Sequence, residues 1–283
     1  MNNEYTDKLL LRLIQGGYTD YEIKEIPYGM QIKVKGGNIR VYENKKGKIT
    51  LDLSQVKDEL LKKYIAGEVD SQDDKLLAPP LIGSDEAGKG DYFGPLCVCA
   101  VYADEGMYRE LASCGIKDSK KLTDKKIQSL KDDILRICPH YSLIEVKNTA
   151  FNDMYKEYQN INIILSKAHA SAIKSVYAKC SCKDVLIDKF STEFRMENEL
   201  KGIGLNIVQK PKAEQNLAVA AASILARYSY MQRLEKMSEM YNIDFCAGAG
   251  AEADMAAKEF CEKYSKEKLY EVCKFNFKNT QKV

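Results

Sequence analysis

The chain has 283 residues, of which 43 are Lys or Arg and 41 are Asp or Glu, giving a net charge of +2. This length suits two domains or one large one, and a hydrophobic content of 45 % is enough for a core, which excludes wholesale disorder. The charge balance excludes a strongly basic coat for nucleic acid but leaves a locally basic cleft open.

The cysteines and the apolar runs exclude several further classes of protein. The nine cysteines form no CxxC pair, so neither zinc-ribbon spacing nor a thioredoxin motif is present. No signal peptide follows Met1, and the longest nearly apolar run, 217–226, is far shorter than the roughly 20 residues that span a bilayer. We therefore expect a cytoplasmic protein with free thiols, no membrane association and no obligate protein partner.

Residues 1–68 have the pattern of a small α/β unit. Apolar residues at helical spacing predict a helix at each end, and alternating apolar and polar residues predict about three antiparallel strands between them. These predicted elements are a helix over 7–15, strands at 30–34, 39–42 and 49–53, and a helix over 56–65. The acidic, polar segment 69–79, with prolines at 79 and 80, predicts a linker to a second domain over 80–283.

The second part of the chain alternates apolar strands with longer helices. The predicted strands are 81–84, 96–102, 141–146, 184–188 and 205–208, and the predicted helices are 122–137, 152–177 and 215–240. Two adjacent apolar strands followed by strand–helix alternation indicate an α/β fold, with a mixed sheet flanked by helices on both faces.

Four carboxylates follow predicted strands or open the last helix. Asp85 and Glu86 come after the first strand of the sheet, Asp188 ends the fourth, and Glu214 stands at the start of the long helix. Neighbouring residues of a strand point to opposite faces, so Asp85 and Glu86 can converge only if the strand ends or bulges there. Oxygen ligands without His or Cys suit Mg²⁺ or Mn²⁺, and two such ions can cleave a phosphodiester. Taken singly, each carboxylate is better explained as a solvated loop residue or a helix cap, but four at corresponding ends of one sheet weaken that explanation.

Two other catalytic readings are disfavoured. Residues 83–89 fit the GxxxxGK pattern of a P-loop, but Gly90 stands where a Ser or Thr is needed, and two carboxylates would repel phosphates. A serine hydrolase is disfavoured because neither His140 nor His169 has the context of a base partner for Ser223. We expect a loop position for His140, a structural role for His169 and helix packing for Ser223.

The motif Gly-Ser-Asp-Glu-Ala-Gly-Lys-Gly-Asp-Tyr-Phe-Gly-Pro at 83–95 resembles the signature of type 2 ribonucleases H. Its Asp-Tyr-Phe-Gly ending is typical of ribonuclease HIII. Further motifs match in order, at 118–123, 162–165, 185–188, 212–214 and 220–227. The resemblance covers essentially all of residues 80–283.

The resemblance implies a ribonuclease H-like fold and an endoribonuclease that cuts the RNA strand of RNA–DNA hybrids, leaving 5′-phosphate and 3′-hydroxyl ends. It assigns the four acidic positions to Asp85, Glu86, Asp188 and Glu214, which would bind two Mg²⁺ or Mn²⁺ ions during catalysis, with Asp85 as the expected bridge. It also implies that residues 1–68 resemble half of a TATA-binding protein and help to bind substrate.

The substrate contacts are predicted from the same motifs. The backbone amides of Gly88, Lys89 and Gly90 are placed to contact a 2′-hydroxyl, and Lys89, Lys120 and Lys121 are candidates for phosphate contacts. Two positions depart from the family pattern: Cys246 begins a segment where a lysine is common, and Asn276 stands where a histidine is common. Two alternatives stay open, namely cleavage at single embedded ribonucleotides, as in ribonuclease HII, and a hybrid-binding protein without catalysis.

Overall fold

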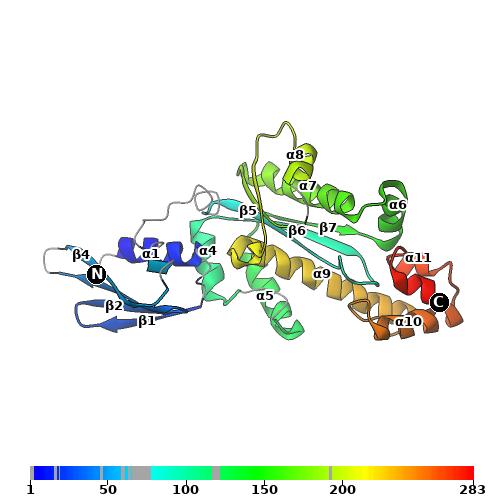
Figure 1. The fold of residues 1–283 in the computed structure, drawn as a ribbon, viewed down its shortest axis with the longest axis horizontal. Coiled ribbons are helices and arrows are strands. Elements are labelled where there is room, and N and C mark those ends of the chain that lie inside the picture. Colours follow the sequence, from blue (N-terminus) through cyan, green and yellow to red (C-terminus); the bar gives the residue numbers. More distant parts are fainter. Residues whose placement is uncertain are drawn as a thin grey trace.

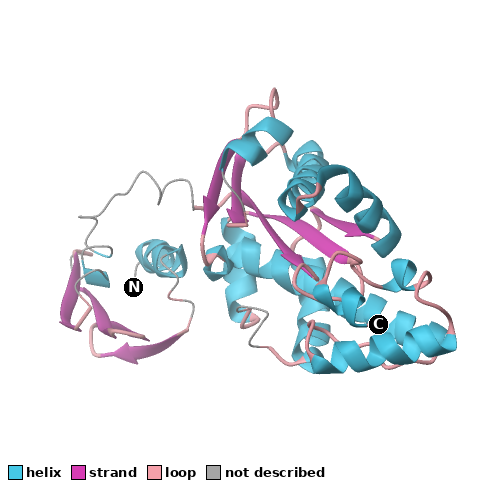
Figure 2. Cartoon of the chain, turned by 45° about the vertical axis from the view of Figure 1, so that its right-hand side comes forward, coloured by secondary structure: helices cyan, strands magenta, loops and turns pink. Residues whose placement is uncertain are grey.

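The computed structural model describes residues 3–15, 18, 20–44, 47–58, 61–62, 65, 78–116, 122–190 and 193–283. Two sheets organise them: a four-stranded antiparallel sheet near the N-terminus and a five-stranded mixed sheet that carries most of the helices (Figures 1 and 2). No helix in these ranges is both long enough and apolar enough to span a bilayer.

In the described part of the N-terminal unit, the helix α1 (Asn3–Gln15) packs on one face of a meander. The strands of the meander are β1 (Tyr21–Ile26), β2 (Gly29–Val34), β3 (Gly37–Glu43) and β4 (Ile49–Val56), and they pair in chain order. Leu9 and Leu13 of α1 bury against Ile32, Ile39 and Val41, which alternate inward along their strands.

The N-terminal unit differs from the predicted elements at one strand, and two predicted segments lie largely outside the described residues. The structure adds β1, which lies at the sheet edge with four of its six residues exposed and so buries little of its alternating pattern. The helix predicted over 56–65 and the linker predicted over 69–79 lie largely outside the described residues. The domain limits 1–68, 69–79 and 80–283 therefore stay a prediction.

The five-stranded sheet has the order β7-β6-β5-β8-β9. Its strands are β5 (Leu81–Ala87), β6 (Leu96–Ala103), β7 (Tyr141–Val146), β8 (Asp184–Asp188) and β9 (Asn206–Lys210). β5 pairs antiparallel with β6 and parallel with β8, so the sheet is mixed, as predicted.

Alternation along the central strands separates two cores. Cys97, Cys99 and Val101 of β6 face a core shared with α9 (Leu217–Tyr241), whereas Val98 and Ala100 face a core shared with α7 (Ile161–Cys180). The other helices of this part are α4 (Glu105–Ser113), α5 (Asp124–Ile137), α6 (Asn148–Tyr158), α8 (Glu193–Glu199), α10 (Ala251–Lys263) and α11 (Leu269–Val272). The expected helix cover on both faces is confirmed.

Three boundaries differ from the predictions. β5 does not end before Asp85 but continues through Glu86 to Ala87, because its pairing with β6 persists to that residue. The helix predicted over 152–177 is two helices, since Gln159 adopts a left-handed φ of 50° and Asn160 caps the second. The long helix begins at Leu217 rather than at 215, with Asn216 as its N-cap.

Gly83 lets α9 approach β5 at backbone distance. A Cβ at this position would lie 2.3 Å from the amide nitrogen of Val219 and 2.4 Å from the carbonyl carbon of Ala218. Gly83→Ala should therefore lower the free energy of unfolding by about 2–3 kcal/mol, because the helix must shift. Denaturant titration measures this, with Gly90→Ala as control, since a Cβ at Gly90 meets no atom within 4 Å. Equal stability of the two variants would contradict the close approach.

Candidate active site

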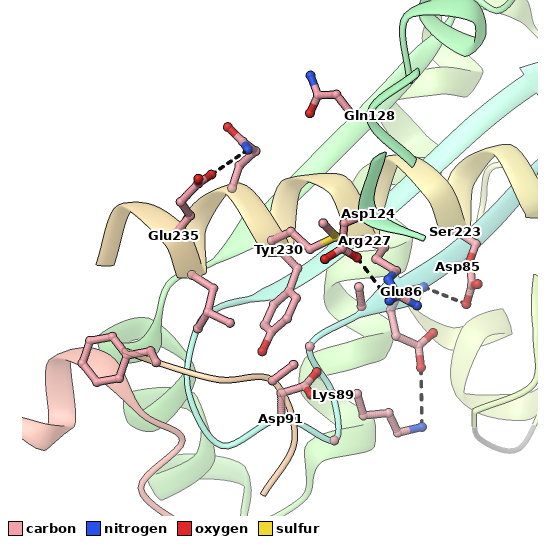
Figure 3. Close-up of a pocket in the computed structure, with 18 of the residues that line it drawn as sticks. Asp85, Glu86, Lys89, Asp91, Asp124, Gln128, Ser223, Arg227, Tyr230 and Glu235 are labelled. Atoms are coloured by element: carbon pink, nitrogen blue, oxygen red, sulfur yellow. Dashed lines mark hydrogen bonds and ion pairs between the residues drawn. The ribbon is translucent and has the colours of Figure 1, made fainter. Parts of the chain in front are cut away.

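Asp85 lies in β5, the central strand of the mixed sheet, on the face that packs against α9. Its side chain is 6 % exposed and accepts hydrogen bonds from Ser223 and, at 2.8 Å, from the backbone amide of Glu86 (Figure 3). Burial raises the pKa of Asp85 well above its ordinary range, and the charges of Glu86 and Asp188 raise it further. An ionised carboxylate here is costly without a cation beside it.

Glu86 points to the opposite side of β5, toward α7. Its Oε2 lies 3.2 Å from Nε2 of His169, and Nδ1 of that ring lies 2.8 Å from Oγ of Ser84. The ring is fully buried and stacks on Phe190 at 4.7 Å, and Nζ of Lys89 lies 3.6 Å from Oε1 of Glu86. Burial acts to raise the pKa of Glu86, but the hydrogen bond with His169 and the charge of Lys89 outweigh it and lower the pKa. The structural role expected for His169 is thus to hold a carboxylate of the cleft.

Asp188 ends β8, next to Asp85 across the parallel pair. The register places Ser84 of β5 opposite Ile187, so the following residues of the two strands are neighbours. Oδ1 of Asp188 accepts a hydrogen bond of 3.0 Å from the amide of Ala213, which opens the 3-10 segment η2 (Ala213–Gln215). Glu214 is half-buried in η2 but is not among the residues that line the cleft. The structure therefore gathers three of the four predicted carboxylates, and the fourth, Glu214, follows the residue whose amide binds Asp188.

The turn after β5 uses its two glycines differently. Gly88 has a φ of 88°, and a Cβ there would lie 2.3 Å from the carbonyl oxygen of Pro95, so only glycine fits. Gly90 is free of such contacts. The amide of Asp91 closes the turn on the carbonyl of Gly88 at 3.4 Å. Gly88, Lys89 and Gly90 all line the cleft, and their contact with substrate stays a prediction.

These residues share one cleft of about 1180 Å³. α5 and α9 extend it, contributing Lys125 and Gln128 from one helix and Arg227 from the other (Figure 3). Arg227 forms an ion pair with Asp124 at 3.8 Å. The sequence motif contained Arg227 without indicating a role for it. Lys120 and Lys121, the other predicted substrate contacts, lie outside the described residues.

The donor set suits a hard divalent cation. Asp85, Glu86 and Asp188 offer carboxylate oxygens, and the buried charge of Asp85 calls for a counter-ion. Within the described residues, no three His, Cys, Asp or Glu side chains already stand close enough to enclose a metal ion. Binding a metal would therefore require the side chains to turn toward one another.

A family comparison decides which proteins this site belongs with. The model of the family described as Ribonuclease HII matches residues 82–280. This range contains all five strands of the mixed sheet, except for Leu81, the first residue of β5. The chain belongs to the type 2 ribonuclease H family. As a type 2 ribonuclease H, it is a nuclease of the hydrolase class.

The similarity of this type 2 ribonuclease H to known relatives also covers the N-terminal unit. The chain is 36 % identical over 211 residues to ribonuclease HIII of Protochlamydia amoebophila, covering 74 % of this chain and 70 % of that one. It is 31 % identical to ribonuclease HIII of Bacillus mycoides, covering 100 % of this chain and 93 % of the relative. The crystal structure of Bst-RNase HIII in complex with Mn²⁺ superposes with a TM-score of 0.69 at 24 % identity, covering 96 % of this chain and 94 % of that one. The fold expected from the resemblance is confirmed, including the small N-terminal sheet.

Proposed function

We propose that the protein is an endoribonuclease that hydrolyses the RNA strand of RNA–DNA hybrids, leaving 5′-phosphate and 3′-hydroxyl ends. The observation that carries this proposal is the placement of Asp85, Glu86 and Asp188 at one end of the sheet, beside a glycine turn in the same cleft. Relatives named ribonuclease HIII support the substrate class. Incubating the protein and Mg²⁺ with a hybrid labelled on the RNA strand, then mapping the product ends, tests it.

The proposal includes two Mg²⁺ or Mn²⁺ ions held by Asp85, Glu86, Asp188 and Glu214. When bound, such ions supply Lewis-acid activation of the attacking water and of the departing 3′-oxygen. A structural relative, Bst-RNase HIII, was solved with Mn²⁺. In this chain, Ser223 and the Glu86 amide fix the orientation of Asp85, while His169 and Lys89 fix that of Glu86. Preoriented ligands lower the cost of assembling the site.

The glycine turn is proposed to read the sugar of the RNA strand. Amides of Gly88, Lys89 and Gly90 would donate to a 2′-hydroxyl, the group that separates RNA from DNA. Lys89 is 38 % exposed, so its ammonium can reach a phosphate while remaining near Glu86. Lys120 and Lys121 are proposed to add further phosphate contacts.

Gly90→Ala tests this close approach. Because a Cβ at this position meets no atom of the protein within 4 Å, the variant should keep the wild-type melting temperature. A methyl group there would meet the incoming backbone and push it away from the amides of the turn, so KM for a hybrid should rise about tenfold, the factor expected when one such hydrogen bond is weakened by about 1.4 kcal/mol. Steady-state kinetics measures it, with Lys174→Met on the exposed side of α7 as control. A wild-type KM would show that the turn does not touch the substrate.

The N-terminal unit, residues 1–68, is proposed to bind the hybrid through the open face of its sheet. The side chains opposite the α1 face are mostly polar, and Arg40 and Gln31 are joined there by a hydrogen bond of 2.9 Å. Lys33 is exposed on the same face, and Tyr42 is half-buried. On this face Lys33 lies 3.2 Å from Glu22 and Arg40 lies 3.9 Å from Asp52, and its basic and amide groups suit the backbone of a duplex.

A further inference from the structure

Lys274 is a buried lysine whose partners are backbone carbonyls. It is fully buried, and its Nζ donates to the carbonyl oxygens of Asp91 at 2.9 Å and Gly94 at 2.8 Å. Its ammonium also lies 5.7 Å from the ring centroid of Phe151. No carboxylate of the described residues is within ion-pair distance of it, although unpaired lysines are rarely buried.

The segment that carries Lys274 is bound to the turn after β5 by backbone contacts as well. The amide of Lys274 donates to the carbonyl of Tyr92 at 2.8 Å, and that of Gly94 donates to the carbonyl of Val272 at 3.1 Å. Asn148 of α6 adds a second donor to the Gly94 carbonyl at 2.8 Å. The carbonyl groups of the loop 91–94 therefore accept hydrogen bonds from residues outside the loop, not from the loop's own amides.

A short chain of contacts leads from Lys274 to the glycine turn. Asp91 donates its amide to Gly88, gives its carbonyl to Lys274, and accepts the amide of Gly248 on Oδ1 at 2.6 Å. Asp91 is therefore fixed at three atoms, and one of these is fixed by the ammonium. Loss of that donor would leave a buried carbonyl unsatisfied, which the loop can relieve only by moving.

Burying this ammonium is costly. Burial lowers the pKa of Lys274 to about 8, and the Asp91 carboxylate and the thiols of Cys97 and Cys273, the titratable groups around it, act in the opposite direction. An unfolded lysine titrates near 10.4, so the unfolded state binds more protons between these values. Stability from this group therefore rises with pH through that window and is diminished at neutral pH. At neutral pH the buried ammonium therefore adds little stability, and its contacts act mainly on the loop that it holds.

We propose that Lys274 is a positioning residue for substrate binding, whose ammonium holds the carbonyls of Asp91 and Gly94 and thereby fixes the turn at Gly88–Gly90. This inference rests on the proposed function, in which that turn contacts the RNA strand. Lys274 lies within the fold and touches no substrate itself. Its effect reaches the cleft through Asp91.

The experiment compares the full-length wild type with Lys274→Met, and with Lys174→Met as a matched lysine on the exposed surface of α7. Amide hydrogen exchange of peptides covering 88–96 reports the loop directly, and steady-state cleavage of a hybrid gives KM and kcat. We expect at least fivefold faster exchange in those peptides and a KM about tenfold higher for Lys274→Met. Its melting temperature at pH 7 should stay within about 2 °C of the wild type, because the burial cost of the charge is removed together with the hydrogen bonds. Lys174→Met should match the wild type throughout.

Wild-type exchange of the 88–96 peptides, or a wild-type KM, would overturn the inference. If Lys274→Met does not fold, Lys274→Leu, which also removes every N–H donor at this position, is held to the same criteria. The pH dependence of stability separates a buried ammonium from simple packing. Between pH 7 and pH 9.5 the melting temperature of Lys274→Met should fall relative to that of the wild type, because only the wild type gains stability as the lysine loses its proton. A difference that stays constant over this range would count against a buried ammonium. If the wild type cleaves no hybrid, the proposed function is contradicted. If both the wild type and Lys274→Met cleave the hybrid with the same KM and the same exchange rates in the 88–96 peptides, only the role of Lys274 is contradicted.

Discussion

Asp85→Asn is expected to lose about 10³-fold or more in the rate of hybrid cleavage while keeping the fold. The carboxylate lies at the meeting point of β5, β8 and α9, with the charges of Glu86 and Asp188 near enough to raise its pKa. Replacing it by an amide removes the charge that would hold a divalent cation, and a loss of several kcal/mol in transition-state stabilisation corresponds to at least this factor. Single-turnover cleavage with saturating Mg²⁺ measures it.

The stability of Asp85→Asn provides the matching control. Because the folded-state pKa of Asp85 is raised, its ionised form destabilises the metal-free protein at pH values above that pKa. The isosteric amide removes this cost, so in the presence of a chelator the variant should melt no lower than the wild type. Ser223→Ala, which deletes the hydroxyl that binds Asp85, should lose far less activity. A folded Asp85→Asn protein with wild-type cleavage would refute the assignment.

Removal of divalent cations is expected to abolish cleavage completely and reversibly. Ser84, His169 and Glu86 are joined in a serine–histidine–carboxylate arrangement, but Ser84 and His169 are fully buried and do not line the cleft, and Oγ of Ser84 lies 2.9 Å from the carbonyl oxygen of Cys99. Among the described residues that line the cleft, Ser223 bonds to Asp85 and no histidine stands beside it. In the proposed reaction, we therefore expect water activation to depend on a bound cation. Cleavage assays in EDTA, followed by addition of Mg²⁺ or Mn²⁺ in excess, measure the loss and the recovery.

Thermal unfolding measures the binding of a divalent cation independently of cleavage activity. At 10 mM Mg²⁺ and a dissociation constant of about 1 mM, linkage gives about 1.4 kcal/mol, or about 2–4 °C in melting temperature for a chain of this size. The wild type should show this shift and Asp85→Asn should not. Cleavage that persists in EDTA, or an equal shift in both proteins, would remove the metal site from the proposal.

The sequence predicted the mixed sheet because its strands are apolar and alternate with helices. Three of the four carboxylates that it named as candidate ligands line one cleft, although the sequence argument for their convergence was partly wrong, and their role stays a prediction. Asp85 and Glu86 do not stand beyond the end of a strand; they lie within β5 on opposite faces, and the partner strand β8 brings Asp188 beside Asp85. Strand ends are hard to read locally because pairing with β6, a neighbour later in the chain, determines how far β5 extends.

The contacts that orient the site could not be predicted from local pattern. His169 reaches Glu86 from 83 residues away, and Lys274 reaches Asp91 from 183 residues away. Neither residue has a distinctive neighbourhood in sequence, since His169 lies among small helical residues and Lys274 in an aromatic run. Only the three-dimensional fold shows that His169 and Lys274 are buried and which residues they contact. Gly88 and Gly90 likewise look equivalent in sequence, yet only Gly88 is required by the turn.

Cleavage of two labelled duplexes tests the central claim most directly. One is an RNA–DNA hybrid, and the other is a DNA duplex that contains a single ribonucleotide. With Mg²⁺, the protein is predicted to cut the RNA strand of the hybrid, leaving 5′-phosphate and 3′-hydroxyl ends, and to leave the second duplex intact. Cleavage of the second duplex alone would indicate an enzyme of the ribonuclease HII type, and binding of the hybrid without any cleavage would contradict catalysis altogether.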